Sequence, residues 1–331
     1  MHLIPRLFSA GTAFAVIGVL PAFADPLPSW YGTPTKAAII EFVEATTTPG
    51  GDSYIDPAER IAVFDNDGTL WAEQPAYFQL AYALDKAKSM VEADPALADK
   101  TPALKAAASG DVDSLLADGH KGLLQVLAAT HTGMTTDEFK QSVADWLASA
   151  RHPKTGRRYD EMVFQPMLEL LSYLRANGFK TYIVSGGGID FIRVFSERVY
   201  GIPPEQVVGS SVKADFVLSE TDADTRKIPE LFFYDDKEGK PVAINHHIGR
   251  RPVIAGGNSD GDHQMLQYAT RGGRPGLAIL VHHTDGDREW AYDRGSKIGG
   301  LDKALDEAEA RGWVVVDMKE DWRTVFPFEL Q

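Results

Sequence analysis

Short apolar runs alternate with segments of helical periodicity along most of the chain. Segment 166–178 has the features of a helix, with Pro166 in its first turn and Asn177-Gly178 at its end. Strands that alternate with helices predict an α/β fold, a Rossmann-like parallel sheet flanked by helices. The predicted strands are 61–65, 180–185, 206–210, 252–256, 277–281 and 314–317. Residues 234–243 are interpreted as a turn between two short strands.

The strand pattern stops between residues 72 and 159. The apolar residues of segment 136–149 fall on one helical face, and Thr135 followed by Glu138 fits a capping box. The predicted helices of this stretch are 76–91, 113–129 and 136–149. We therefore expect an α/β core, residues 25–71 and 160–331, that is interrupted by an all-helical insertion, residues 72–159.

Composition and charge narrow the possible partners. The 331 residues are 44% hydrophobic, and the mean hydropathy is -0.20, which is ordinary for a globular protein. A net charge of -14 repels nucleic acid and anionic membranes, so neither is an expected partner. The chain has no cysteine, which excludes disulfides, thiolate metal sites and cysteine nucleophiles.

The first 24 residues have the pattern of a signal peptide. An apolar run, 7–20, ends at Pro21, and the small-x-small pattern of 22–24 precedes Asp25. The run is short for a membrane span. We expect cleavage after residue 24, export to the periplasm or the medium, and no stable membrane association afterwards.

Polar residues follow three of the predicted strands. Ligands of open parallel sheets bind beyond the carboxyl ends of the strands, so these residues are the candidates for a site. Asp65 and Asp67 at the tip of an apolar strand are costly unless something compensates their charge. Neither acidic stretch has the glycine and glutamate spacing of an EF-hand. The candidate stretches are 65–69 (DNDGT), 185–188 (SGGG) and 258–262 (NSDGD), with Lys240 before the last of them.

Taken together, these stretches resemble the motifs of the haloacid dehalogenase (HAD) superfamily of phosphohydrolases, in its phosphoserine-phosphatase-like branch. Residues 65–69 match the first motif, DxDGT, and 182–188 match the second, an apolar strand that ends in Ser or Thr. Lys240 suits the third motif, and 253–266 resemble the fourth. The helical insertion resembles the cap of that branch. The similarity covers roughly residues 55–285.

The resemblance implies a role for each motif. Asp65 would attack phosphorus and form an aspartyl-phosphate. Asp67 would protonate the leaving oxygen and then activate water, which requires a pKa raised toward working pH. The Ser185 hydroxyl, the Gly186 amide and Lys240 would bind the phosphoryl oxygens.

The resemblance also implies a Mg²⁺ cofactor, bound by Asp65 and the backbone carbonyl of Asp67. One departure concerns the fourth motif, because Asn258 stands where the family usually has aspartate. Asp262 matches the second acid of the motif, and Asp260 is additional. Asparagine ligates hard cations through its carbonyl oxygen but brings no charge. We expect Asn258 to ligate directly and Asp262 directly or through water, with Asp260 as the alternative.

Three further features have two interpretations each. Glu73 occupies a place comparable to the acid that contacts the substrate's amino group in phosphoserine-specific relatives, or it is a solvated hinge residue. Thr69 orients Asp67, or its hydroxyl only stabilises a turn. Segment 281–294, rich in histidine and acids, follows the fifth strand and either borders the site or is structural. Neighbouring histidines of one strand point to opposite faces, so we favour the structural interpretation.

These observations predict an exported, Mg²⁺-dependent phosphomonoesterase that acts on a small phosphorylated metabolite. A true dehalogenase is disfavoured by Asp67, because that reaction has no leaving oxygen to protonate. A metallophosphatase without a covalent intermediate is a second alternative. A periplasmic binding protein for a phosphorylated solute is a third, although two acids that face a phosphate would repel it.

Overall fold

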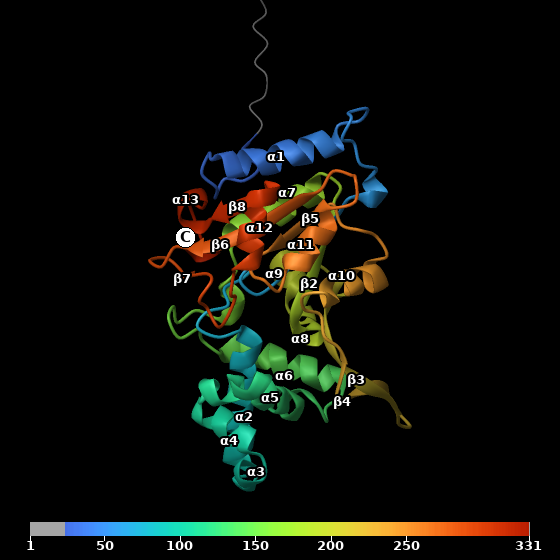
Figure 1. Ribbon diagram of the computed structural model, residues 1–331. Helices are drawn as coiled ribbons and strands as arrows, with labels where there is room; N and C mark the ends of the chain where they lie inside the picture. Colours follow the sequence, from blue (N-terminus) through green and yellow to red (C-terminus); the bar gives the residue numbers. More distant parts are fainter. Residues whose placement is uncertain (1–23, 331) are drawn as a thin grey trace, which may run out of the picture.

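An eight-stranded sheet lies at the centre of the molecule (Figure 1). The structure is a computed structural model that describes residues 24–330, with the backbone only for residues 116 and 118–120. The predicted signal peptide therefore lies outside the described residues, except for Ala24. The strands are β1 (Ile61–Phe64), β2 (Lys180–Gly188), β3 (Val207–Leu218), β4 (Ala223–Phe233), β5 (Ile254–Gly257), β6 (Leu277–Thr284), β7 (Ala291–Tyr292) and β8 (Val314–Asp317).

The strand order is β4-β3-β2-β1-β5-β6-β7, and β8 pairs with β6. All neighbours are parallel except β4, which runs antiparallel to β3, and β7, which runs antiparallel to β6. β1 is fully buried between β2 and β5. Because parallel strands end at the same edge, the residues after β1, β2 and β5 lie close together.

Helices cover both faces of the sheet. Ile39 of α1 and Leu170 of α7 share a buried cluster with Phe64, whereas Met265 of α11 packs in the cluster of Val63. Neighbouring residues of a strand point to opposite faces, so these clusters are the two sides of the sheet. The predicted α/β fold is confirmed. The core helices are α1 (Pro34–Thr47), α7 (Gln165–Ala176), α8 (Ile189–Arg193), α9 (Ser196–Tyr200), α10 (Gly239–Ala243), α11 (His263–Thr270), α12 (Lys303–Arg311) and α13 (Met318–Asp321).

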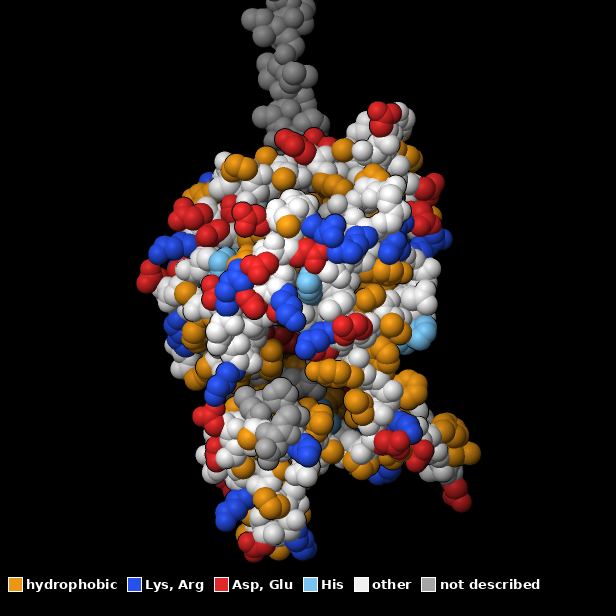
Figure 2. Space-filling view, in the orientation of Figure 1, with side chains coloured by type: hydrophobic (Ala, Val, Ile, Leu, Met, Phe, Trp, Pro, Cys, Tyr) orange, Lys and Arg blue, Asp and Glu red, His pale blue; other side chains and the backbone are white. Residues whose placement is uncertain are grey.

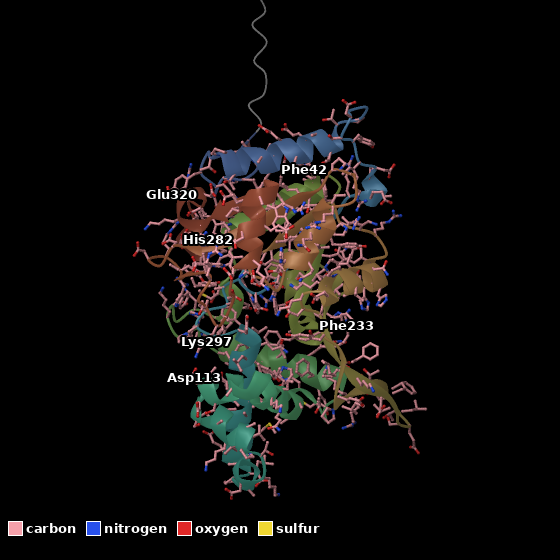
Figure 3. All side chains as sticks on the ribbon, in the orientation of Figure 1. Phe42, Asp113, Phe233, His282, Lys297 and Glu320 are labelled. Carbon is pink, nitrogen blue, oxygen red and sulfur yellow. The ribbon has the colours of Figure 1, made fainter. Side chains whose placement is uncertain are left out.

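The insertion is helical and lies at one end of the molecule (Figure 1). Its helices are α2 (Phe78–Ala93), α3 (Ala96–Lys100), α4 (Pro102–Ser109), α5 (Val112–His131) and α6 (Thr136–Ser149). Thr135 and Glu138 form the predicted capping box of α6. An exposed ion pair between Asp113 of α5 and Lys297 of the core spans the junction at 2.9 Å (Figure 3). The exact division into units, 25–71 with 160–331 and 72–159, stays a prediction.

Aromatic rings attach the insertion to the core. Tyr82 of α2 and Trp146 of α6 both contact Phe191 of α8, at 5.8 Å and 6.3 Å between ring centroids. Rings at such distances attract each other beyond the area that they bury. Within residues 24–330, no helix has the length and apolar character needed to cross a bilayer.

Two predictions for segment 206–243 were wrong. β3 continues to Leu218 and forms a long antiparallel hairpin with β4, which we did not predict. Residues 234–243 are a turn that leads into helix α10 and do not join two strands. Most residues of β4 are exposed, and charged side chains interrupt its apolar pattern, so it lacks the signal of a core strand.

Candidate active site

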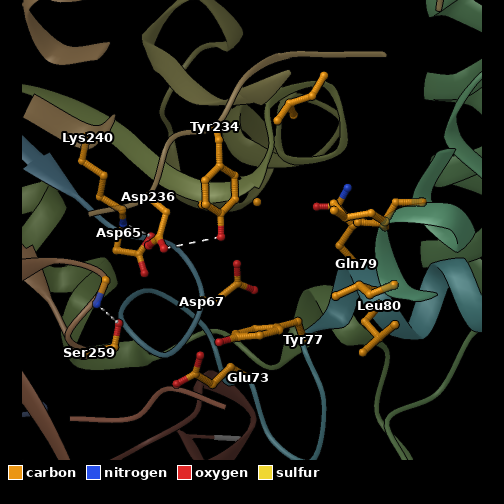
Figure 4. Close-up of a pocket in the computed structure, with 17 residues that line it drawn as sticks. Asp65, Asp67, Glu73, Tyr77, Gln79, Leu80, Tyr234, Asp236, Lys240 and Ser259 are labelled. Carbon is orange, nitrogen blue, oxygen red and sulfur yellow. Dashed lines mark hydrogen bonds and ion pairs between the residues drawn. The ribbon is translucent and has the colours of Figure 1, made fainter. Parts of the chain in front are cut away.

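Part of the predicted site lines one cavity of about 450 Å³: Asp65, Asp67, Glu73, Gly186 and Lys240 (Figure 4). The predicted residues Ser185, Asn258 and Asp262 do not line it. Asp65 and Asp67 follow β1, Gly186 lies near the end of β2, and Lys240 comes from α10. In Figure 4, Lys240 and Asp65 lie at one side, and Tyr234 and Tyr77 face Asp67 from opposite sides. The topology thus brings together residues that are far apart in sequence.

The loop after β1 requires glycine at position 68. Gly68 has a φ of 71°, and a Cβ built there would lie 2.0 Å from Asn258 Nδ2 and 2.4 Å from Glu73 Oε1. Both the left-handed backbone and the close approach exclude a larger side chain. The Gly68 carbonyl lies 2.7 Å from Nε2 of the buried His283. This loop is therefore fixed by contacts with two distant segments.

Lys240 joins the two buried carboxylates of the site. Its Nζ donates hydrogen bonds to Asp65 Oδ1 at 2.8 Å, to Asp262 Oδ1 at 2.6 Å and to the Val184 carbonyl at 3.0 Å. Burial lowers the pKa of Lys240, but the charges of Asp262 and Asp65 outweigh it and raise the pKa above its ordinary value. Lys240 is therefore an ammonium ion, and each of its three N–H donors bonds to an oxygen of the protein.

Burial and the charge of Asp262 raise the pKa of Asp65 well above the ordinary value of an aspartate, and Lys240 opposes that shift. Burial also raises the pKa of Asp67, to about 6. An acid that titrates near neutrality can both give and take a proton, as the predicted role of Asp67 requires.

Trp71 orients Asp67 in place of the expected Thr69. The indole Nε1 of Trp71 donates a hydrogen bond to Asp67 Oδ1 at 2.9 Å. The Thr69 hydroxyl donates to Asn258 Oδ1 at 3.1 Å, so the prediction that Thr69 orients Asp67 was wrong. The buried Trp71 ring is itself stacked on Phe195 at 4.5 Å between centroids, which fixes its direction.

Glu73 is buried and is not the solvated hinge residue that we considered. Its Oε1 accepts hydrogen bonds from Asn258 Nδ2 at 2.7 Å and from the Tyr292 hydroxyl at 2.8 Å. Burial raises the pKa of Glu73 to about 8, so the neutral acid dominates at pH 7. A neutral carboxyl group that already accepts two hydrogen bonds is poorly suited to an ammonium group of a substrate.

The segment after β6 borders the site through two side chains. His283 Nδ1 lies 3.0 Å from Glu289 Oε2, and the His283 ring stacks on Tyr292 at 4.3 Å between centroids. Burial alone would lower the pKa of His283, but Glu289 outweighs it and raises the pKa. The structural interpretation of segment 281–294 is consistent with these contacts, although they reach Glu73 and the loop at Gly68.

The three candidates of the fourth motif have different environments. Asp262 Oδ2 accepts hydrogen bonds from the Asn258 amide at 3.0 Å, the Ser259 amide at 3.1 Å and the Ser259 hydroxyl at 3.2 Å. Because Lys240 occupies its other oxygen, Asp262 fits an indirect role better than direct ligation. Asp260 accepts hydrogen bonds from three backbone amides at the start of α12 and does not line the cavity, which disfavours the alternative that Asp260 ligates the metal.

Gly186 lines the same cavity as Asp65 and Asp67, and Ser185 lies close to Asp67 across Gly187. A Cβ built at the intervening Gly187 would be 3.3 Å from Ser185 Oγ and 3.4 Å from Asp67 Oδ2. The buried Ser185 hydroxyl accepts a hydrogen bond from the Gly187 amide at 3.1 Å. The phosphate-binding roles of Ser185, Gly186 and Lys240 stay predictions.

The charge balance of the site suits a divalent cation. Asp65, Asp67 and Asp262 face one ammonium group, that of Lys240, and this excess of carboxylates would repel a phosphate. Within residues 24–330, no cluster of three or more His, Asp or Glu side chains is placed to hold a metal. The predicted Mg²⁺ ligands include fewer than three such side chains, because two of them, the Asp67 carbonyl and the Asn258 amide oxygen, are neutral oxygen ligands that Mg²⁺ accepts. The residues present therefore fit Mg²⁺, with Asp262 contacting the ion through water and not directly.

Two solved proteins of unknown function have a fold similar to that of this chain. A conserved functionally unknown protein from Anaerococcus prevotii is similar in structure, with 16% identity, a TM-score of 0.52, and 83% of this chain and 88% of that chain covered. A protein with unknown function from Bordetella pertussis has 17% identity and a TM-score of 0.52, with 78% and 99% covered. A phosphoserine phosphohydrolase-like protein from Francisella tularensis has 21% identity and a TM-score of 0.38, with 67% and 87% covered.

A 69-residue stretch is 36% identical to NAD(P)H-quinone oxidoreductase subunit N from Prochlorococcus marinus; it covers 21% of this chain and less than half, 44%, of that protein. The family model of haloacid dehalogenase-like hydrolases matches residues 62–267, which include all four predicted motifs. This match confirms the resemblance that we inferred from the motifs. The chain belongs to the haloacid dehalogenase-like hydrolase family.

Proposed function

We propose that the protein is a phosphomonoesterase that works through an aspartyl-phosphate at Asp65. The observation that carries this proposal is the pairing of two different acids at the end of β1. Asp65 accepts a hydrogen bond from Lys240, and Asp67 has a pKa raised to about 6 by burial. Acyl-phosphate chemistry needs one acid as a nucleophile and another that exchanges protons.

In the first step, an Asp65 oxygen forms a bond to phosphorus while the bond from phosphorus to the leaving oxygen breaks. Asp67 gives its proton to that oxygen, so that an alcohol leaves. In the second step, Asp67 takes a proton from water, the water oxygen attacks phosphorus, and the bond to Asp65 breaks. Inorganic phosphate leaves, and both aspartates return to their starting states.

The other residues of the site position the phosphoryl group and balance its charge. The Ser185 hydroxyl and the Gly186 amide would bind phosphoryl oxygens, and Lys240, whose three donors already bond to the protein, would attract them through its charge. Asp65, the Asp67 carbonyl and Asn258 would hold Mg²⁺, which when bound offsets the repulsion between carboxylates and phosphate. Trp71 keeps Asp67 directed toward the cavity.

Release of phosphate from p-nitrophenyl phosphate by the mature protein, residues 25–331, tests the proposal. We expect turnover with Mg²⁺, loss of turnover after EDTA treatment, and recovery when Mg²⁺ is restored in excess. Binding of phosphate esters without any release of phosphate would contradict it and favour a binding protein. Full activity in EDTA would contradict the metal requirement alone.

We also propose export, which rests on the signal-peptide pattern of residues 1–24. Expression of the full chain in a Gram-negative host, followed by fractionation and N-terminal sequencing, tests this proposal. The expected product lies in the periplasmic fraction and begins at Asp25. An unprocessed chain in the cytoplasmic fraction would contradict export.

A further inference from the structure

A second cavity of about 280 Å³ adjoins the catalytic cavity. It lies between the cap helices α5 and α6 and the β3–β4 hairpin, the element that the sequence did not reveal. Both cavities share part of their walls, so they lie directly side by side. The shared residues are Gln79, Leu124, Leu127, Gly186, Leu231 and Tyr234.

The walls of the second cavity are mostly apolar. Phe139 of α6 and Phe191 of α8 line it and are buried. On the hairpin, Val212 pairs with Leu231, and directly opposite residues of an antiparallel pair project to the same face. Both of these residues line the cavity.

The charged side chains that line this cavity already have partners, and Glu230 forms an exposed ion pair with Lys213. Lys227 forms an ion pair with Asp190. The Nε2 atom of His131 lies 2.9 Å from the Gln79 amide, and its Nδ1 lies 2.8 Å from the Thr130 hydroxyl. Burial lowers the pKa of His131 to about 3, so the ring is neutral at pH 7. No uncompensated charge in the described wall would select a charged ligand.

Large apolar side chains remain exposed where the two cavities meet. Leu124 is 55% exposed, Leu231 53% and Tyr234 59%, and all three line both cavities. Hydrophobic side chains border the hollow between the two parts of the molecule in Figure 2. Exposed apolar residues that gather at a concave site typically mark the place where a ligand buries its own apolar surface.

We propose that the second cavity binds the apolar part of the leaving alcohol, so that the substrates are phosphomonoesters with an uncharged alkyl or aryl group larger than serine. This inference rests on the proposed function. With the phosphoryl group at Asp65, the leaving group extends past Gln79 and Tyr234 into the second cavity. The Glu73 Oε1 atom already accepts hydrogen bonds from Asn258 and from the Tyr292 hydroxyl, which leaves it poorly placed to bind a substrate amino group and agrees with this substrate class.

Ethyl, butyl and hexyl phosphate test the inference, because their leaving groups differ in apolar length and little in acidity. Each buried methylene should raise kcat/KM about threefold to fourfold. We expect hexyl phosphate to exceed ethyl phosphate by at least about 30-fold, with O-phosphoserine no better than ethyl phosphate.

Val212→Trp fills the second cavity from a residue that does not line the catalytic cavity. It should lower kcat/KM for hexyl phosphate about tenfold or more and leave ethyl phosphate within about twofold. Leu218→Trp is the matched control, since Leu218 is an exposed residue of the same strand that lines neither cavity. Ser211→Trp, also a residue of the second cavity alone, serves as a second filling variant if Val212→Trp does not fold.

The outcomes separate the inference from the proposed function. Hydrolysis of p-nitrophenyl phosphate with no dependence on alkyl length overturns the inference and leaves the phosphatase intact. Equal losses on ethyl and hexyl phosphate in the filling variants overturn it as well. Failure to hydrolyse any ester, p-nitrophenyl phosphate included, overturns both.

Discussion

The end of the sheet and the apolar cavity beside it differ in how their side chains are held. At the sheet end, Lys240 makes three hydrogen bonds and Asp262 accepts four. In the second cavity, Val212 and Leu231 make only van der Waals contacts with their surroundings. A directed polar network determines which bond can break, whereas an apolar wall determines which alcohol fits. Changes in the first region should be large and independent of the size of the alcohol, and changes in the second should be smaller and selective for that size.

Asp65→Asn should show this contrast most strongly. An amide cannot attack phosphorus, so kcat should fall about 10⁴-fold or more for every ester, whatever its length. Asp215→Asn, an exposed acid on β3, is the control and should keep wild-type rates. Rates measured with both ethyl and hexyl phosphate check the prediction, and substantial activity of Asp65→Asn would rule out Asp65 as nucleophile.

Lys240→Met should destabilise the protein by about 3 to 5 kcal/mol, because it leaves Asp65 and Asp262 buried without a cation. The matched control is Lys213→Met, which removes an exposed ion pair with Glu230 and should cost less than about 1 kcal/mol. Urea unfolding of the two variants and the wild type measures both costs. Equal costs would mean that the polar network at the sheet end is not held by Lys240.

Asp67→Asn should separate leaving groups by acidity and not by size. Alkyl phosphates need protonation of the leaving oxygen and should lose about 10²- to 10⁴-fold, while p-nitrophenyl phosphate should lose much less. Because the acid form is needed, and burial raises the pKa of Asp67 to about 6, wild-type kcat for alkyl esters should fall as pH rises above that value. Steady-state kinetics across pH test this, and equal losses on both classes would contradict the acid role.

Asn258→Asp should lower the Mg²⁺ concentration for half-maximal activity about tenfold, because it adds a negative ligand. The neutral Glu73 carboxyl can donate a hydrogen bond to the new carboxylate, so the change is tolerated. Asp260→Asn, at the start of α12, is the control and should leave the titration unchanged. If the Mg²⁺ dependence of activity is unchanged in Asn258→Asp but lost in Asp262→Asn, the metal ligand is Asp262 and not Asn258.

Glu73→Gln should have the smallest effect, a change in the pH dependence of stability. The folded pKa of Glu73, about 8, lies above its ordinary value of 4.5, so wild-type stability is highest below pH 4.5 and is lost as pH rises toward 8. Glutamine keeps an oxygen for Tyr292 and Asn258 and removes the titration. Between pH 5 and 8, the free energy of unfolding should fall on the order of 2 kcal/mol more in the wild type than in the variant. Urea unfolding at several pH values measures this difference. Parallel curves for the two proteins would contradict a buried, titrating Glu73.

The sequence predicted the elements whose signals are local. The run at Ile61–Phe64 indicated a buried strand, and the box at Thr135 marked the start of α6. Asp65, Asp67 and Lys240 could be grouped before the structure was known, because the motifs follow one another as in the family.

The parts that escaped prediction depend on contacts between distant segments. Nothing near Trp71 indicates that its indole donates to Asp67, and Tyr292 lies far along the chain from Glu73. The saturated hydrogen bonding of Asp262 follows from the conformation of its loop, which spacing does not reveal. The β4 strand escaped because its exposed, charged residues lack the alternation of a core strand.

Acid-quenched mass spectrometry during turnover tests the central claim most directly. Mature protein is mixed with p-nitrophenyl phosphate and Mg²⁺, quenched in acid within the first turnovers, digested and mapped. The account predicts one phosphoryl group on the peptide that contains Asp65, more of it in Asp67→Asn, where hydrolysis of the intermediate is slowed, and none in Asp65→Asn. Steady turnover with no phosphoryl group on Asp65 at any time, or with the group on another residue, would contradict the account.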